Sequence, residues 1–240
     1  MQDLTITLVQ ANQRWEDKEA NLSNYDQLLK NVSNTDLIVL PEMFHTGFSM
    51  KTEKLAETMN NSMGISWLKH TAYSKKTAIY TSLIIKERNC FFNRGVFVEP
   101  SGKISVYDKR KCFGLAGEDK FFNAGNQESI VSYKHWKFQL QICYDLRFPE
   151  IVRNRITAND EAAYDVILYI ANWPERRNIH WKTLLKARAI ENQSYVVGVN
   201  RVGIDGSQLS YSGDSAVIDA LGYENTLSEG IEEFKSIIIS

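Results

Sequence analysis

The chain has 240 residues, a length typical of one large domain or two small ones at about 100–200 residues per domain. Hydrophobic residues make up 43% and charged residues 24%, which excludes a disordered tail, a collagen-like repeat and a disulfide scaffold. Lys and Arg total 28 against 29 Asp and Glu, so the net charge of −1 predicts no binding of nucleic acid or of an anionic membrane.

The cysteines and the N-terminal segment indicate in which cellular compartment the protein is found. Cys90, Cys112 and Cys143 are an odd number without a C-x-x-C pair, which fits neither a zinc site nor a disulfide framework and indicates reducing conditions. The N-terminal segment lacks the basic start of a signal peptide, and no stretch approaches the roughly 18 apolar residues of a membrane-spanning helix. We therefore expect a cytoplasmic protein.

The apolar pattern predicts strands that alternate with helices. The first half predicts strands at residues 4–8, 37–40, 78–85, 95–98 and 104–107, with helices at 20–32 and 65–72. The second half predicts strands at 138–142, 166–170, 195–199 and 216–218, with a helix beginning at Pro149 and another at 181–193. The similar order of the halves predicts an α/β fold with two stacked sheets, although a single doubly wound sheet also fits. Nothing marks a linker, so we expect one domain over residues 1–240.

Three chemically useful side chains lie where predicted strands end. Glu42 follows the strand at 37–40, Lys109 follows the strand at 104–107, and Cys143 follows the strand at 138–142. In α/β folds ligands gather at the C-terminal ends of strands. A carboxylate, an ammonium and a thiol brought together there can perform covalent acyl transfer. Taken singly, each has an ordinary structural interpretation: a turn residue, a solvated cation and a small buried hydrophobe.

Five motifs in order carry a resemblance to a known family. They are LPEMFHTGF (40–48), YDKRKCF (107–113), QICYDLRFPE (141–150), YIANWP (169–174) and LLKARAIENQSYVVGVNRVG (184–203). Together they resemble the nitrilase superfamily of carbon–nitrogen hydrolases, and the likeness runs from TLVQAN (7–12) to GDSAVIDALG (213–222). The resemblance implies the four-layer α-β-β-α sandwich of that superfamily.

The resemblance also implies roles for the site residues. Cys143 is the expected nucleophile, Glu42 the general base and Lys109 the group that stabilises the tetrahedral intermediate. Glu118 is expected to support Lys109 or the substrate, and the backbone N–H of Tyr144 to contribute to an oxyanion hole. These groups supply nucleophile, base and oxyanion stabiliser, so we expect no metal and no cofactor.

Within the superfamily, CYDLRFPE and ANWPERR in a short chain look most like the ω-amidases. That subgroup releases ammonia from the terminal amide of 2-oxo dicarboxylic acid monoamides, namely 2-oxoglutaramate and 2-oxosuccinamate. Because such substrates are anions, we expect Arg176 and Arg177 to bind the carboxylate, and Phe44 and Trp173 to form pocket walls. The family resemblance further implies a homodimer.

Several alternatives stay open on the sequence. An amidase of deaminated glutathione shares much of the CYDLRFPE motif, and another nitrilase-family amidase is a related possibility. A Cys–His hydrolase would need His45 or His180 beside the thiol, although neither lies in a familiar motif of that class. From a different class, the chain is a non-catalytic binding or assembly module that retains the fold, but such a module has no physical reason to keep the three residues together.

Two charged pairs in the motifs are expected to form ion pairs that hold the turn after the cysteine and the helix that follows. These are Arg147 with Glu150, and Arg188 with Glu191.

Overall fold

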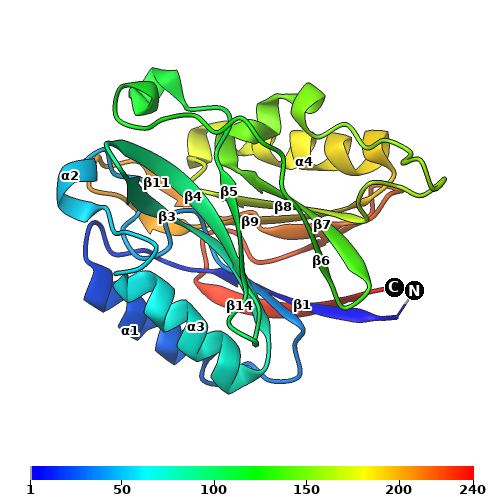
Figure 1. Ribbon diagram of the computed structural model, residues 1–240, viewed down its shortest axis with the longest axis horizontal. Helices are drawn as coiled ribbons and strands as arrows, with labels where there is room; N and C mark the ends of the chain where they lie inside the picture. Colours follow the sequence, from blue (N-terminus) through cyan, green and yellow to red (C-terminus); the bar gives the residue numbers. More distant parts are fainter. Residues whose placement is uncertain (1) are drawn as a thin grey trace.

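The computed structural model of the chain describes residues 2–240, which form two six-stranded sheets, a two-stranded ribbon and flanking helices (Figure 1). The helices are α1 (Lys18–Leu29), α2 (Thr52–Leu55), α3 (Met63–Lys75) and α4 (Asn178–Asn192). Short 3-10 turns are η1 (Gly114–Ala116), η2 (Glu118–Lys120), η3 (Cys143–Arg147), η4 (Pro149–Ile151) and η5 (Glu175–Arg177).

The first sheet has the strand order β14-β1-β2-β3-β4-β5, in which β1, β2 and β3 are parallel and the other pairs antiparallel. Its strands are β1 (Leu4–Gln10), β2 (Leu37–Val39), β3 (Ala78–Glu87), β4 (Cys90–Val98), β5 (Ile104–Asp108) and β14 (Glu233–Ile239). The last strand returns beside the first, with Leu4 opposite Ile239.

The second sheet has the order β13-β12-β9-β8-β7-β6, with β7, β8 and β9 parallel. Its strands are β6 (Ile130–Tyr133), β7 (Trp136–Ile142), β8 (Val166–Ala171), β9 (Tyr195–Asn200), β12 (Ala216–Ile218) and β13 (Glu224–Thr226). The ribbon consists of β10 (Val202–Ile204) and β11 (Ser210–Ser212).

Helices cover the outer faces of both sheets, so the layers run α-β-β-α. Helices α1 and α3 lie against the first sheet and α4 lies against the second (Figure 1). Alternation along β2 shows the two faces: Leu37 and Val39 join the core shared with the second sheet, whereas Ile38 packs with the helices. This arrangement confirms the expected four-layer sandwich. Each helix within residues 2–240 is too short or too polar to cross a lipid bilayer.

The prediction of a helix that begins at Pro149 is wrong. Pro149 starts only the single 3-10 turn η4. The chain then leaves helical geometry because Asn154 bonds to distant partners: its Nδ2 donates to the carbonyls of Tyr164 and Asn192, at 3.1 and 3.3 Å. These bonds tie the segment after η4 to Tyr164, which precedes β8, and to Asn192 at the end of α4.

Candidate active site

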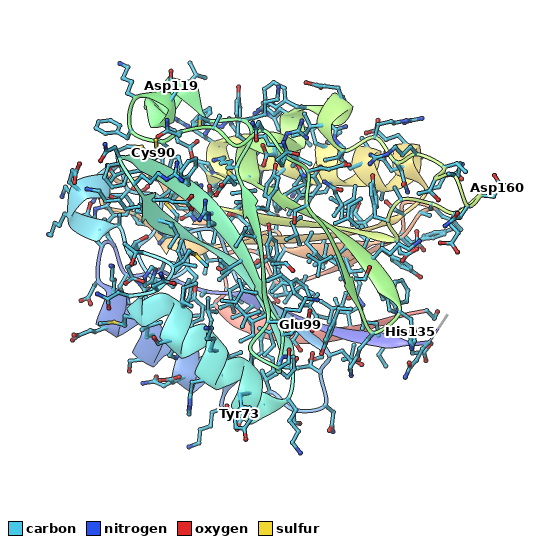
Figure 2. The ribbon with its side chains drawn as sticks, viewed as in Figure 1. Tyr73, Cys90, Glu99, Asp119, His135 and Asp160 are labelled. Atoms are coloured by element: carbon cyan, nitrogen blue, oxygen red, sulfur yellow. The ribbon has the colours of Figure 1, made fainter. Side chains whose placement is uncertain are left out.

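The candidate site lies near the loop that carries Asp119, which Figure 2 labels, because the neighbouring Glu118 contacts Lys109. Glu42 follows β2 and is fully buried. Its Oε1 accepts hydrogen bonds from Asn93 Nδ2 (2.7 Å) and Lys109 Nζ (3.0 Å), and its Oε2 accepts one from the backbone N–H of Asn172 (2.8 Å). The carboxylate is therefore held from both sheets.

Lys109 directly follows β5 and is also buried, between two carboxylates. Its Nζ lies 3.0 Å from Glu42 Oε1 and 2.9 Å from both carboxylate oxygens of Glu118. Burial by itself lowers the pKa of an ammonium, but the charges of Glu118 and Glu42 outweigh it here and raise the pKa of Lys109 well above its usual value. Lys109 is therefore a fixed positive charge.

Cys143 follows β7 as the first residue of η3, with a left-handed backbone (φ 49°). For a residue other than glycine this conformation costs about 1–2 kcal/mol, so the surrounding structure must hold it. The Sγ atom lies 4.0 Å from the carbonyl oxygen of Asn172. Burial and the charge of Glu42 raise the pKa of the thiol, although Lys109 opposes them. The resting thiol is therefore protonated and needs a base before it can attack.

The turn that carries Cys143 is held by Asp145, a buried residue that sequence reasoning missed. Its Oδ2 accepts hydrogen bonds from Ile142 N (3.0 Å) and Tyr107 Oη (2.9 Å), and its Oδ1 accepts one from Lys111 N (2.9 Å). Asp145 thus joins the nucleophile turn to the loop after β5. The available signal was a carboxylate two residues beyond a strand-end cysteine.

Glu118 and Asn93 complete the buried polar network. Glu118 is fully buried. In addition to the bonds from Lys109, its carboxylate accepts a hydrogen bond from the backbone N–H of Phe113 at 2.5 Å. Asn93 in β4 donates to both Glu42 and Glu118. Sequence reasoning missed Asn93, which lies in none of the five motifs, and Asn172, which lies in the YIANWP motif but was given no role there.

A cavity of about 600 Å³ opens above the thiol. Cys143 and Asn172 lie in its wall together with four of the predicted residues, Tyr144, Trp173, Arg176 and Arg177. Other lining side chains include Trp15, Phe48, Phe113, Leu115, Arg147, Leu209 and Tyr211. A pocket of this size with aromatic walls and a few polar groups is typical of small-molecule sites.

The structure corrects the expectation for Phe44. Its ring is fully buried beneath the site, 5.5 Å from the ring of Tyr25 and 5.6 Å from that of Trp67. Phe44 is a core residue and forms no wall of the cavity, because the chain turns after Glu42 and directs this side chain toward α1 and α3.

The cavity wall carries three arginines that are free of carboxylate partners. Within residues 2–240 the arginine ion pairs belong to Arg94, Arg155 and Arg188. Arg147 lies over the rings of Trp173 and Tyr144, and Arg177 over the ring of Phe113. Burial and the neighbouring charge of Arg176 lower the pKa of Arg177. Glu16 and Asp205 also line the cavity, but Lys51 and the three arginines leave its wall with an excess of positive charge, which suits an anion.

One of the two expected ion pairs forms and the other does not. Arg188 Nη1 lies 2.9 Å from Glu191, and its Nη2 donates to the carbonyl of Leu146 at 2.6 Å, which holds the end of η3. Arg147 does not pair with Glu150, which lies 3.6 Å from Lys111 instead. Arg147 stacks on the cavity wall, a position that the motif did not predict.

The histidines considered for a Cys–His mechanism bond elsewhere. His45 is buried with Nε2 3.3 Å from Glu57, and His180 lies beside Arg147. Within residues 2–240 no group of three or more His, Cys, Asp or Glu side chains is arranged to hold a metal ion.

Comparison with known proteins identifies the family. The carbon-nitrogen hydrolase family model matches residues 5–232. The chain therefore belongs to the carbon–nitrogen hydrolases of the nitrilase superfamily, as its motifs predicted. It is 43% identical over 222 residues to omega-amidase YafV of Yersinia enterocolitica, covering 92% of this chain and 84% of that protein. It is 34% identical over 209 residues to 2-oxoglutaramate amidase of Bacillus subtilis, covering 85% and 77%. These relatives place it in the ω-amidase subgroup.

The solved structures agree with the fold. The crystal structure of XC1258 from Xanthomonas campestris, a CN-hydrolase superfamily protein with an arsenic adduct in its active site, superposes with a TM-score of 0.97. The two sequences are 41% identical, and the match covers 100% of this chain and 91% of the other.

Proposed function

We propose that this protein is an ω-amidase that hydrolyses the terminal primary amide of 2-oxoglutaramate or 2-oxosuccinamate. The products are ammonia and the dicarboxylic 2-oxo acid. The observation that carries the proposal is the buried contact of Lys109 with Glu42 and Glu118 beside a strand-end cysteine, under a cavity whose free arginines suit an anionic substrate. The activities of the relatives support the choice of substrate.

In the first half-reaction Glu42 takes the proton of the Cys143 thiol as sulfur attacks the amide carbon. The C–S bond forms, and the carbonyl becomes an oxyanion that the ammonium of Lys109 and the N–H of Tyr144 stabilise. The N–H groups in the first turn of a helix have no intrahelical acceptor, which leaves that of Tyr144 free for this role. Protonated Glu42 then gives its proton to the amide nitrogen, the C–N bond breaks and ammonia leaves.

In the second half-reaction water replaces ammonia. Glu42 takes a proton from the water as the water oxygen attacks the thioester carbon, and the Lys109 ammonium and the Tyr144 N–H stabilise the new oxyanion. The C–S bond then breaks, the acid leaves, and Glu42 returns the proton to Cys143. Glu118 holds Lys109 in place through both steps, since it contacts the ammonium with both oxygens.

The substrate carboxylate is proposed to bind among the free guanidinium groups. Arg176 and Arg177 are the residues that the sequence predicted for this role. Arg147, from the QICYDLRFPE motif, lines the same cavity. The indole of Trp173 forms the wall beneath Arg147, with its ring centre 4.9 Å from the guanidinium carbon. A guanidinium binds a carboxylate through two parallel hydrogen bonds, which orients the substrate chain as well as retaining it.

A panel of amides assayed for ammonia release tests the function. We expect the highest kcat/KM with 2-oxoglutaramate or 2-oxosuccinamate, and no turnover by Cys143→Ala. Preference for deaminated glutathione as substrate would assign the alternative amidase function. Absence of turnover on every amide, with ligand binding retained, would favour a non-catalytic module.

We further propose that residues 1–240 act as one domain, as a homodimer, in the cytoplasm. The three unpaired cysteines fit reducing conditions, and the site draws residues from both sheets, which requires them to work as one unit. A molar mass from light scattering that is twice the mass of the chain would support the dimer, and a molar mass equal to that of one chain would contradict it.

A further inference from the structure

Arg147 is held on the cavity wall by ring faces. Its guanidinium carbon lies 4.9 Å from the ring centre of Trp173 and 5.9 Å from that of Tyr144, and all three residues line the cavity with Cys143. Trp173 is itself fixed, because its Nε1 donates to the carbonyl of Arg177 at 2.9 Å. Contact with ring faces holds the guanidinium against the wall but supplies no directional bond that fixes its rotation about the side-chain torsions.

His180 supplies the contact that stops this rotation. Its Nδ1 lies 3.0 Å from Nη2 of Arg147. A guanidinium only donates, so Nδ1 is the acceptor in this contact. His180 lies in the first turn of α4, directly before Trp181, whose ring packs 5.6 Å from that of Trp173. One helical turn therefore supports both the wall and the arginine that lies on it.

We propose that His180 is a positioning residue for the substrate carboxylate and acts through Arg147. The inference rests on the proposed function, in which Arg147 binds the carboxylate. The bond to His180 uses one N–H of the guanidinium and fixes its rotation, which leaves the remaining N–H groups for a two-bond contact with a carboxylate. His180 itself touches neither substrate nor thiol, so its effect falls on the binding of anionic substrates.

Two variants of His180 separate this role from a general structural one. His180→Leu removes the acceptor and is expected to raise KM for 2-oxoglutaramate about 3- to 10-fold, the contribution of one hydrogen bond, with kcat unchanged. His180→Asn places Oδ1 where Nδ1 lies and is expected to restore KM. KM for pentanamide, a neutral amide of the same chain length, is expected to stay constant in both.

His135→Leu is the matched control. It removes another histidine, in the turn between β6 and β7 at the other end of the molecule (Figure 2), and is expected to leave every constant unchanged. Calorimetric titration with 2-oxoglutarate gives a second measurement that needs no catalysis, and its dissociation constant is expected to follow KM through the variants.

Several results overturn the inference. They are an unchanged KM for 2-oxoglutaramate in His180→Leu, an equal rise in KM for pentanamide, or a failure of His180→Asn to restore KM. If the wild-type protein releases no ammonia from ω-amides, the proposed function fails, while the dissociation constants for 2-oxoglutarate still decide the role of His180. Equal dissociation constants in wild type and His180→Leu, or no binding by either, then overturn it.

Discussion

The protonation states around Cys143 determine which residue must begin the reaction. Burial raises the pKa of the thiol, so little thiolate exists before substrate arrives. Lys109 cannot take the proton, because Glu118 and Glu42 keep it charged. Glu42 is the acceptor that remains, since it contacts Lys109 and its charge acts on the Cys143 thiol. The chemistry therefore depends on a base whose position is fixed by three donors.

Glu42→Gln tests that dependence. The substitution keeps the size of the side chain but removes the base, so both acylation and hydrolysis are expected to slow by about 10²- to 10⁴-fold. Single-turnover kinetics with 2-oxoglutaramate measures the two steps separately. Turnover near the wild-type rate would contradict the role of Glu42 and direct attention to Glu118.

Asp145 gives the site a predictable response to acid. Burial raises its pKa from 3.8 to about 6, although Lys109 and three hydrogen bonds oppose the shift. Activity needs the ionised form, because protonation removes an acceptor from the turn that holds Cys143. We expect kcat to fall as the pH drops through about 6, and expect Asp145→Asn to be slow and to lack this limb. A wild-type kcat that is flat from pH 7 to pH 5 would contradict the role of Asp145.

The contribution of Asp145 to the stability of the fold should change with pH in the opposite direction to its effect on activity. The folded state binds the Asp145 proton more tightly than the unfolded state, whose pKa is the ordinary 3.8. The contribution of Asp145 to the free energy of unfolding is therefore greatest below pH 4 and declines as the pH rises through about 6. Urea unfolding of wild type and Asp145→Asn measures this effect. The free energy of unfolding of wild type, relative to that of Asp145→Asn, should decrease from pH 4 to pH 7. An increase over that range would contradict the raised pKa of Asp145.

The residues that sequence reasoning found and missed differ in a physical way. Glu42, Lys109 and Cys143 stand at strand ends within motifs, so their position was visible one segment at a time. Asn93 and Asn172 matter because separate strands bring them to the same carboxylate. Asn172 does stand in a motif directly after a strand, but its pairing with Glu42 joins residues far apart in the sequence, and only the fold reveals that pairing.

Elements with unbroken apolar runs were the easiest to predict. The strands at 37–40 and 166–170 are buried on both faces, and the structure has β2 and β8 there. The strands β6, β13 and β14 were missed, because edge strands are half exposed and carry many polar residues. Helix α4 begins at Asn178, earlier than the start at residue 181 that the sequence predicted, because the turn η5 leads directly into it.

The C-terminal strand offers a matched test of edge packing. Ile237 is 7% exposed and packs in the core between the sheets, whereas its neighbour Ile238 is 65% exposed. Ile237→Ala is expected to lower the free energy of unfolding by about 2–4 kcal/mol, and Ile238→Ala by less than about 0.5 kcal/mol. Urea unfolding measures both. Equal losses would contradict the register in which Ile237 faces inward.

At the scale of the whole molecule, the site exists because two sheets meet. Glu42 and Lys109 come from the first sheet, and Cys143 and Asn172 from the second. The hydrogen bond from Asn172 N to Glu42 Oε2 crosses between them. The motif order in the sequence predicted this assembly through family resemblance, whereas the pattern of apolar residues favoured two stacked sheets but left a single doubly wound sheet possible.

The assembled site contains a thiol, a carboxylate and an ammonium, which together supply nucleophile, base and oxyanion stabiliser. We therefore expect dialysis against EDTA to leave kcat and KM for 2-oxoglutaramate unchanged. The assay is repeated after zinc is added back. A loss of activity that zinc restores would contradict a mechanism based on these three groups.

The central claim is that Cys143 carries the acyl group of the substrate. Rapid-quench intact-mass spectrometry during the first turnover of 2-oxoglutaramate tests it directly. We expect a transient mass increase equal to the acyl group, located on the peptide that contains Cys143 and absent from Cys143→Ala, whereas Cys90→Ala behaves as wild type. Turnover by Cys143→Ala, or an adduct on another residue, would contradict it.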